Sequence, residues 1–200
     1  MAPRLKDLEL VELRDSAEWR AWLGSNHATS PGIWLAIGKK GNARTALSYE
    51  DAVLEALCFG WIDSTTAKLD ADRFKQLFTP RKPTSTWSRS NKVRVEKLVA
   101  QGRMMPPGLA AVQAAKANGS WTLLDDVEDL IVPKDLAKAL RADPAAKRGF
   151  DAFPDSARKL FLYWIASAKR ADTRTSRIAE TVRLVAQDIR MPGRLPPGED

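Results

Sequence analysis

The residues best suited to bind an anion are concentrated between Arg81 and Arg103. This segment carries seven lysines and arginines against one carboxylate, Glu96, so its formal charge is +6. An arginine fork binds carboxylate and phosphate oxygens, free amides at a helix N-terminus add positive potential, and an aromatic ring stacks on planar groups. The segment therefore predicts a ligand site with these candidate residues: Arg81, Lys82, Trp87, Ser88, Asn91 and Lys92.

The same segment also fits a solvated basic helix face that follows an ordered turn. Runs of charge in globular proteins usually face water, and Trp87 would then belong to the hydrophobic core. This interpretation is the more common one for such a run. Both interpretations stay open at the level of the sequence.

A second basic cluster lies near the C-terminus, with Lys169, Arg174 and Arg177 as its candidate residues. If the residues from 173 onward form one helix, Arg174 and Arg177 share a face, and they would extend the Arg81 surface if they point toward it. In the alternative, Thr173 caps the helix, and the arginines pair with Asp63, Asp172 or backbone carbonyls. Caps and local ion pairs are commoner than sites, which favours the structural role.

Asp63 is a lone acid that directly follows Trp61 and Ile62. A general base needs a partner, and no second carboxylate, histidine or cysteine stands at a motif spacing that would complete an active site. We therefore expect Asp63 to be an ion-pair partner of Arg81 or Arg174 within the candidate site. We do not expect it to be a catalyst.

The sequence gives no sign of a metal or cofactor. A single cysteine, Cys58, excludes an intramolecular disulfide and a cysteine-based zinc site, and a single histidine, His27, leaves no histidine cluster. Phosphate-binding loops, dinucleotide fingerprints, nucleophile elbows and metalloprotease motifs are missing as well. We expect neither a metal nor a cofactor.

The overall charge bears on partners and location. The net charge of +7 favours an anionic small molecule, an acidic protein surface or nucleic acid. Residues 1–10 are charged and lack the apolar stretch of a secretory signal, and no apolar run approaches the length that spans a bilayer. We expect a cytoplasmic protein that does not insert into a membrane.

The elements that must position these residues begin with a small sheet. Ile33 to Ile37 is short, rich in β-formers and bounded by glycines, so it predicts a buried strand. The segments that begin at Trp61 and end at Phe78 predict a hairpin turning near Asp70. Together they predict an antiparallel sheet of about three strands, to which residues 8–13 would add a short strand. Helices are predicted to start at Asp15 and Ser48 and to end at Gly24 and Gly60.

From residue 83 onward the pattern is helical. Ser88 or Ser90 starts one helix, and the last helix opens at Asp172 or Thr173. Its apolar stripe is predicted to be Ile178, Val182, Val185 and Ile189, with Val182 buried at the centre. The sequence thus predicts one α+β domain over residues 1–190, with the sheet in about 1–82 and helices in about 83–190. Residues 191–200 hold three prolines and two glycines and predict a disordered tail.

Several short stretches in a fixed order carry a family resemblance. They include Gly60-Trp61-Ile62-Asp63, Phe78-Thr79-Pro80-Arg81-Lys82, Ser85-Thr86-Trp87-Ser88, Asn91-Lys92 and, near the end, Trp164-Ile165 with Ala168-Lys169-Arg170. Together they resemble the YdeI/OmpD-associated family of bacteriocin-protection proteins, over roughly residues 15–190. The resemblance implies protection against bacteriocins and association with an outer-membrane porin, but no catalytic residues. A porin partner requires export, so we do not carry that association over.

These observations favour a non-enzymatic binding or stress-resistance protein with a basic and aromatic surface for an anionic ligand or partner. A nucleic-acid-binding protein is the second hypothesis, supported by charge and interleaved tryptophan but not by any standard recognition motif. The third is an enzyme with an unrecognised site around Asp63.

Overall fold

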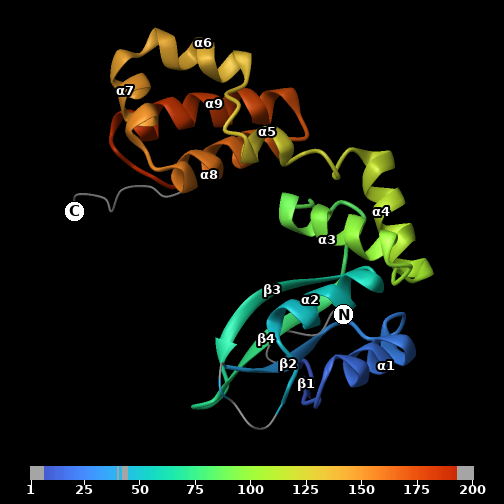
Figure 1. Ribbon diagram of the computed structural model, residues 1–200. Coiled ribbons are helices and arrows are strands. Elements are labelled where there is room, and N and C mark those ends of the chain that lie inside the picture. The colour runs from blue at the N-terminus through green and yellow to red at the C-terminus, as the bar shows by residue number, and fades with distance from the viewer. Residues whose placement is uncertain (1–6, 40, 42–44, 193–200) are drawn as a thin grey trace. The chain divides into compact units, whose positions relative to one another are not determined.

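The computed structural model describes residues 7–39, 41 and 45–192. The chain divides into two compact units, residues 1–121 and 122–200 (Figure 1). The predicted tail lies outside the described residues from position 193 onward, as do residues 1–6 of the N-terminal segment. The predicted α+β class, with a sheet early in the chain and helices after it, is confirmed.

The first unit is built on a sheet of four strands in the order β1-β2-β4-β3. The strands are β1 (Leu10–Val11), β2 (Ile33–Gly38), β3 (Trp61–Lys68) and β4 (Arg73–Pro80). β3 and β4 form the predicted hairpin, and β4 also pairs antiparallel with β2. The short strand predicted over residues 8–13 is present as β1, but it pairs parallel to β2, so the sheet has four strands and is mixed, not purely antiparallel.

Three of the four helices described in this unit begin at a residue whose side chain caps them, and α4 begins at a proline. They are α1 (Ser16–Asn26), α2 (Tyr49–Cys58), α3 (Arg89–Ala100) and α4 (Pro106–Asn118). The side chains of Asp15, Ser48 and Ser88 accept hydrogen bonds from free amides in the first turns of α1, α2 and α3. The predicted stop at Gly24 is wrong, since α1 runs on for two more residues to Asn26. Gly60 does follow the end of α2, in the left-handed region at φ 73°.

One hydrophobic core joins the sheet to all four helices of the unit. Ile33, Leu35 and Ile37 of β2 are buried against Trp19 of α1 and the apolar face of α2. Val95 and Leu98 of α3 belong to the same core, and so does Val112 of α4. The division between the compact units therefore falls after α4, not near residue 83 where the sequence changes from strand to helix.

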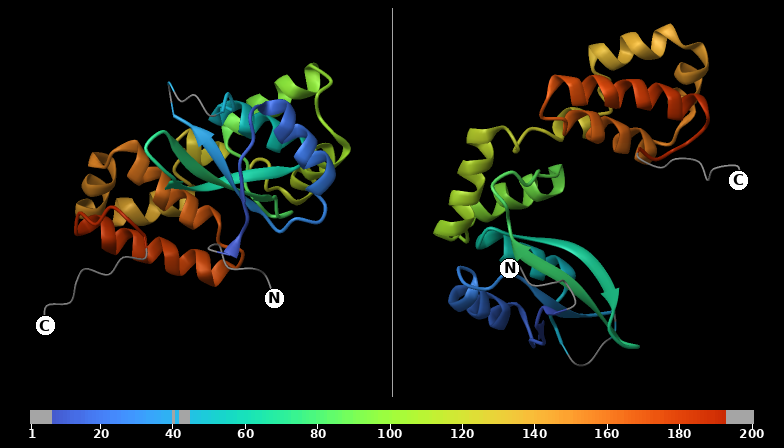
Figure 2. Two further views of the ribbon diagram at one scale, coloured as in Figure 1. Left: turned by 90° about the horizontal axis from the view of Figure 1, so that it is seen from below. Right: turned by 180° about the vertical axis from the view of Figure 1, so that it is seen from behind.

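The second unit consists of helices. They are α5 (Asp125–Glu128), α6 (Lys134–Ala142), α7 (Pro144–Ala152), α8 (Asp155–Ala166) and α9 (Ala171–Ala186). Figure 2 shows α6, α7, α8 and α9 packed side by side. Their core is separate from that of the first unit and contains Phe150, Phe161 and Leu184. That the two units act as one domain over residues 1–190 stays a prediction.

The buried stripe of α9 differs from the predicted one. Thr181, Leu184 and Val185 are almost fully buried, whereas Val182 is half-buried. Thr181 can occupy the centre because its hydroxyl donates a hydrogen bond of 2.7 Å to the Arg177 carbonyl inside the helix. A buried hydroxyl with its hydrogen bond made carries little penalty, so a polar residue takes the place predicted for Val182.

Candidate functional site

Arg81 lies where β4 ends and the chain turns toward α3. Its backbone amide donates a hydrogen bond of 2.9 Å to the carbonyl oxygen of Gly60. Its guanidinium carbon lies 3.6 Å from the centre of the buried Trp87 ring. Nη1 donates a hydrogen bond of 2.8 Å to the carbonyl oxygen of Thr86. One face and one nitrogen of the guanidinium are therefore held by the short segment that leads into α3.

The rest of the Arg81 guanidinium has no partner among the described residues. The side chain is 9% exposed, and both Nε and Nη2 are shielded from solvent without a hydrogen bond. A buried, unpaired polar group normally costs free energy, and native proteins rarely keep one. Such a group is a candidate for a functional role because the fold itself does not use it.

The charge on Arg81 is correspondingly disfavoured. Burial lowers the pKa of its guanidinium from 12.5 to about 10, and the negative charge of Asp63 acts in the opposite direction. Asp63 is near enough to exert this effect but forms no ion pair with Arg81 within the described chain. The predicted pairing of these two side chains is thus present only as a longer-range attraction.

Asp63 accepts a hydrogen bond from Tyr49, a residue that was not among the candidates predicted from the sequence. The Tyr49 hydroxyl, in the first turn of α2, donates a hydrogen bond of 2.7 Å to Oδ2 of Asp63 in β3. Partial burial and this hydrogen bond raise the pKa of Tyr49 to about 12. Fourteen residues separate the two side chains, and only the packing of α2 against β3 brings them together.

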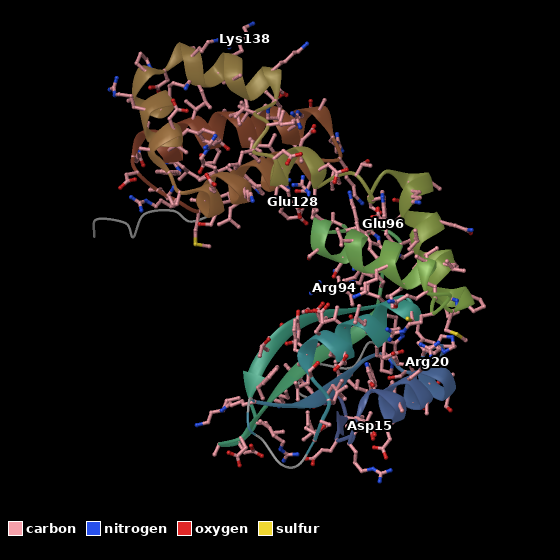
Figure 3. All side chains as sticks on the ribbon, in the orientation of Figure 1. Asp15, Arg20, Arg94, Glu96, Glu128 and Lys138 are labelled. Atoms are coloured by element: carbon pink, nitrogen blue, oxygen red, sulfur yellow. The ribbon has the colours of Figure 1, made fainter. Side chains whose placement is uncertain are left out.

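The candidate residues Ser88 and Asn91 have structural roles at the start of α3. Ser88 caps the helix by accepting from the Asn91 amide at 3.3 Å. The Asn91 side chain accepts from Arg94, whose guanidinium also makes two hydrogen bonds to Glu50 of α2. Figure 3 shows Arg94 on the side of α3 that faces α2. Arg94 and Glu50 are neighbours of the site that sequence reasoning missed.

The two lysines of the basic segment differ in position. Lys82 is exposed. The ammonium group of Lys92 lies 5.5 Å from the Trp121 ring, which in turn lies 5.0 Å from the Trp87 ring. Carboxylates on α2 offset part of the +6 charge, since Glu50 pairs with Arg94 and Glu55 pairs with Arg103. The positive charge that this segment leaves for a ligand is therefore smaller than its formal charge of +6.

Arg174 and Arg177 belong to the second unit and are engaged within it. Two nitrogens of Arg174 bind the two oxygens of Asp135 at 2.7 and 3.0 Å. Nη1 of Arg177 donates to the Trp164 carbonyl and to the Ser167 hydroxyl. Lys169 is exposed. The expected contacts to backbone carbonyls are confirmed, since Arg177 binds the Trp164 carbonyl and Arg174 the Ile165 carbonyl. The carboxylate partner of Arg174 is Asp135, which the sequence did not indicate.

A hollow of about 610 Å³ borders Arg177 in the second unit, but Asp172 and Glu180 also line it. Its charge does not favour an anion. Within the described part of the chain, no three histidine, cysteine or acidic side chains gather in a way that would hold a metal ion. No described helix is long and apolar enough to cross a membrane.

Comparison with known proteins fits the division into two units. The fold and the Arg81 site define the first unit as a small α+β module in which the buried Arg81 leaves two guanidinium nitrogens without a hydrogen bond among the described residues. The chain belongs to the family described as Domain of unknown function (DUF8412), whose model matches residues 11–111. Residues 129–188 match the model described as Bacteriocin-protection, YdeI or OmpD-Associated.

The second match confirms the family resemblance, over a narrower range than residues 15–190. The stretches between Gly60 and Lys92 lie within the first match. No curated protein and no solved structure matches the chain.

Proposed function

We propose that the protein is a non-enzymatic, cytoplasmic binding protein that holds an anionic ligand on Arg81. The observation that carries this proposal is the buried Arg81 guanidinium with Nε and Nη2 unpaired. A cation buried at a cost to stability is explained if a ligand supplies the missing hydrogen bonds. The relation to bacteriocin-protection proteins is consistent with a role in stress resistance.

The described surroundings of Arg81 favour binding over catalysis. Asp63, the acid whose charge acts on Arg81, accepts a hydrogen bond from Tyr49, and His27 hydrogen-bonds to the Leu23 carbonyl. A carboxylate or histidine positioned to take a proton from a nearby nucleophile would favour an enzyme instead. Glu50 and Glu55 neutralise Arg94 and Arg103 of the basic segment, which favours a small anion over a nucleic-acid backbone, because the latter needs many free cations.

Thermal stability in the presence of anions tests the proposal. An anion that binds only the folded protein raises its melting temperature in a saturable way. We expect sodium acetate or sodium phosphate, titrated at constant ionic strength, to stabilise the wild type and not Arg81→Gln. Lys138→Gln removes the same charge from an exposed side chain of α6, outside the candidate site, and should respond like the wild type. An equal response in all three proteins, or none in the wild type, would overturn the anion site.

A random oligonucleotide serves as the competing probe. Tight binding with a steep dependence on salt, unaffected by Arg81→Gln, would favour the nucleic-acid hypothesis over the small-anion one.

A further inference from the structure

The orientation of the Arg81 guanidinium indicates which kind of anion suits it. Nη1 is engaged with the Thr86 carbonyl, and the two nitrogens left over are Nε and Nη2. These two form one edge of the guanidinium, and their N–H bonds point the same way. That edge is the fork that binds two oxygens of one group side by side.

The Trp87 ring limits the shape of the bound group. It lies 3.6 Å from the guanidinium carbon and therefore covers one face of the fork. A carboxylate is planar and binds within the plane of the guanidinium, so the ring does not obstruct it. A phosphate group is tetrahedral and projects oxygens above and below that plane, so one of them points to the side of the guanidinium on which the Trp87 ring lies.

The charges nearby limit the charge of the bound group. Arg94, the other cation that senses Asp63, is occupied by Glu50 and Asn91. Asp63 itself is close enough to influence Arg81. One unpaired cation beside one carboxylate tolerates a single negative charge better than the charge of about −1.5 to −2 that a phosphate group carries at neutral pH.

On this basis, and resting on the proposed function, we infer that the ligand of Arg81 is a carboxylate, bound through both oxygens to Nε and Nη2. The shielding of these nitrogens from solvent means that the carboxylate enters when the side chains around them shift. Residues 82–87 lie outside the helices and strands, and Thr86 and Trp87 contact the guanidinium directly, so this segment borders the bound carboxylate.

The arginine Nε–Hε resonance is a direct reporter of this contact. In ¹⁵N-labelled protein, the Arg81 Nε signal is identified as the one that Arg81→Lys removes. We expect acetate, titrated at constant ionic strength, to shift this signal saturably, and inorganic phosphate to leave it unchanged. Backbone signals around Trp87 should follow the acetate titration in the wild type. In Arg81→Lys, which keeps the charge and loses the fork, they should show binding at least about tenfold weaker.

The possible outcomes separate the two proposals. If phosphate saturates the Arg81 signal and acetate does not, the anion site stands and the carboxylate assignment is overturned. If neither probe shifts the Arg81 signal in a saturable way, both the assignment and the anion site fail. Lys138→Gln, at an exposed position of α6, is the control, because it should bind acetate as the wild type does.

Discussion

Arg73 and Arg81 stand at the two ends of the same strand and are equally buried, yet only Arg73 is paired. Arg73 begins β4 and is 8% exposed, and Arg81 follows the last residue of β4 and is 9% exposed. Arg73 donates to Asp70 and to Glu12 at 2.9 and 2.6 Å. Arg81 leaves two nitrogens without a hydrogen bond among the described residues. A buried arginine in this sheet can therefore have its hydrogen bonds satisfied by the protein, and Arg81 differs from Arg73 in that two of its nitrogens do not.

This contrast predicts opposite effects of the same substitution. Arg81→Met removes an uncompensated charge and keeps an apolar stem over Trp87, so the free energy of unfolding should stay level or rise by about 1–3 kcal/mol. Arg73→Met is the matched control and should lower stability, because it removes the ion pairs with Asp70 and Glu12. Urea denaturation at pH 7 measures both. A large loss of stability in Arg81→Met would make Arg81 a structural residue.

The pKa shifts of Arg81 and Tyr49 predict opposing pH dependences. The pKa of Arg81 falls from 12.5 to about 10, so above about pH 10 the unfolded chain binds more protons at this position and stability rises with pH. The pKa of Tyr49 rises from 10.0 to about 12, so its contribution is complete below pH 10 and is lost as the pH rises through 12. The two effects oppose each other between about pH 10 and 12.

Single substitutions should separate these two effects. Relative to the wild type, Arg81→Met should lose stability as the pH increases from about 10 to 12, and Tyr49→Phe should gain it. Denaturation curves at several pH values give the differences directly. Tyr163→Phe, which removes another exposed tyrosyl hydroxyl, is the control. Parallel curves for all the variants would show that neither group is perturbed as described.

Asp63 should weaken the binding of any anion to Arg81. Its charge repels a bound carboxylate, so Asp63→Asn should tighten acetate binding by a factor of roughly two to ten. Asp72→Asn removes the same charge at the exposed turn of the hairpin, next to Arg73, and should change the affinity little. Acetate titrations of the two variants make the comparison. Weaker binding in Asp63→Asn would instead make Asp63 part of the ligand contact.

The sequence predicted Arg81 and Trp87 as candidates because charge and aromatic residues are visible in a linear pattern. It also predicted the hairpin, the caps at Asp15 and Ser48, and a cap at Ser88 or Ser90, since these features depend on neighbouring residues. It could not predict the link between Tyr49 and Asp63, or the pairing of Arg94 with Glu50. These contacts form only when α2 packs beside β3 and α3, and periodicity within a segment carries no information about that packing.

The last helix shows a similar limit. The predicted stripe is confirmed at Ile178 and Val185, but Thr181 and Leu184 are buried between them where Val182 was predicted at the centre. Leu184→Ala should therefore cost about 2–5 kcal/mol, and Val182→Asp distinctly less, because a half-buried carboxylate keeps access to water. Thermal melts of both variants test the assignment. The reverse ranking would restore Val182 to the centre of the stripe.

Gly149 of α7 allows the two units to be tested for independent unfolding. A methyl group there would collide with the carbonyl oxygen of Val185 in α9, so Gly149→Ala must push the two helices apart. Overpacking of this kind costs about 1–3 kcal/mol. Six of the seven tryptophans lie in the first unit and only Trp164 lies in the second, so fluorescence reports mainly on the first unit. Helical circular dichroism reports on both. If the units unfold independently, Gly149→Ala should lower the dichroism transition and leave the fluorescence transition near its wild-type temperature.

Gly108→Ala is the converse control, since its methyl group would collide with the Cys58 carbonyl inside the first unit and should lower the fluorescence transition. Equal shifts of both signals in both variants would show that residues 1–190 unfold as a single domain.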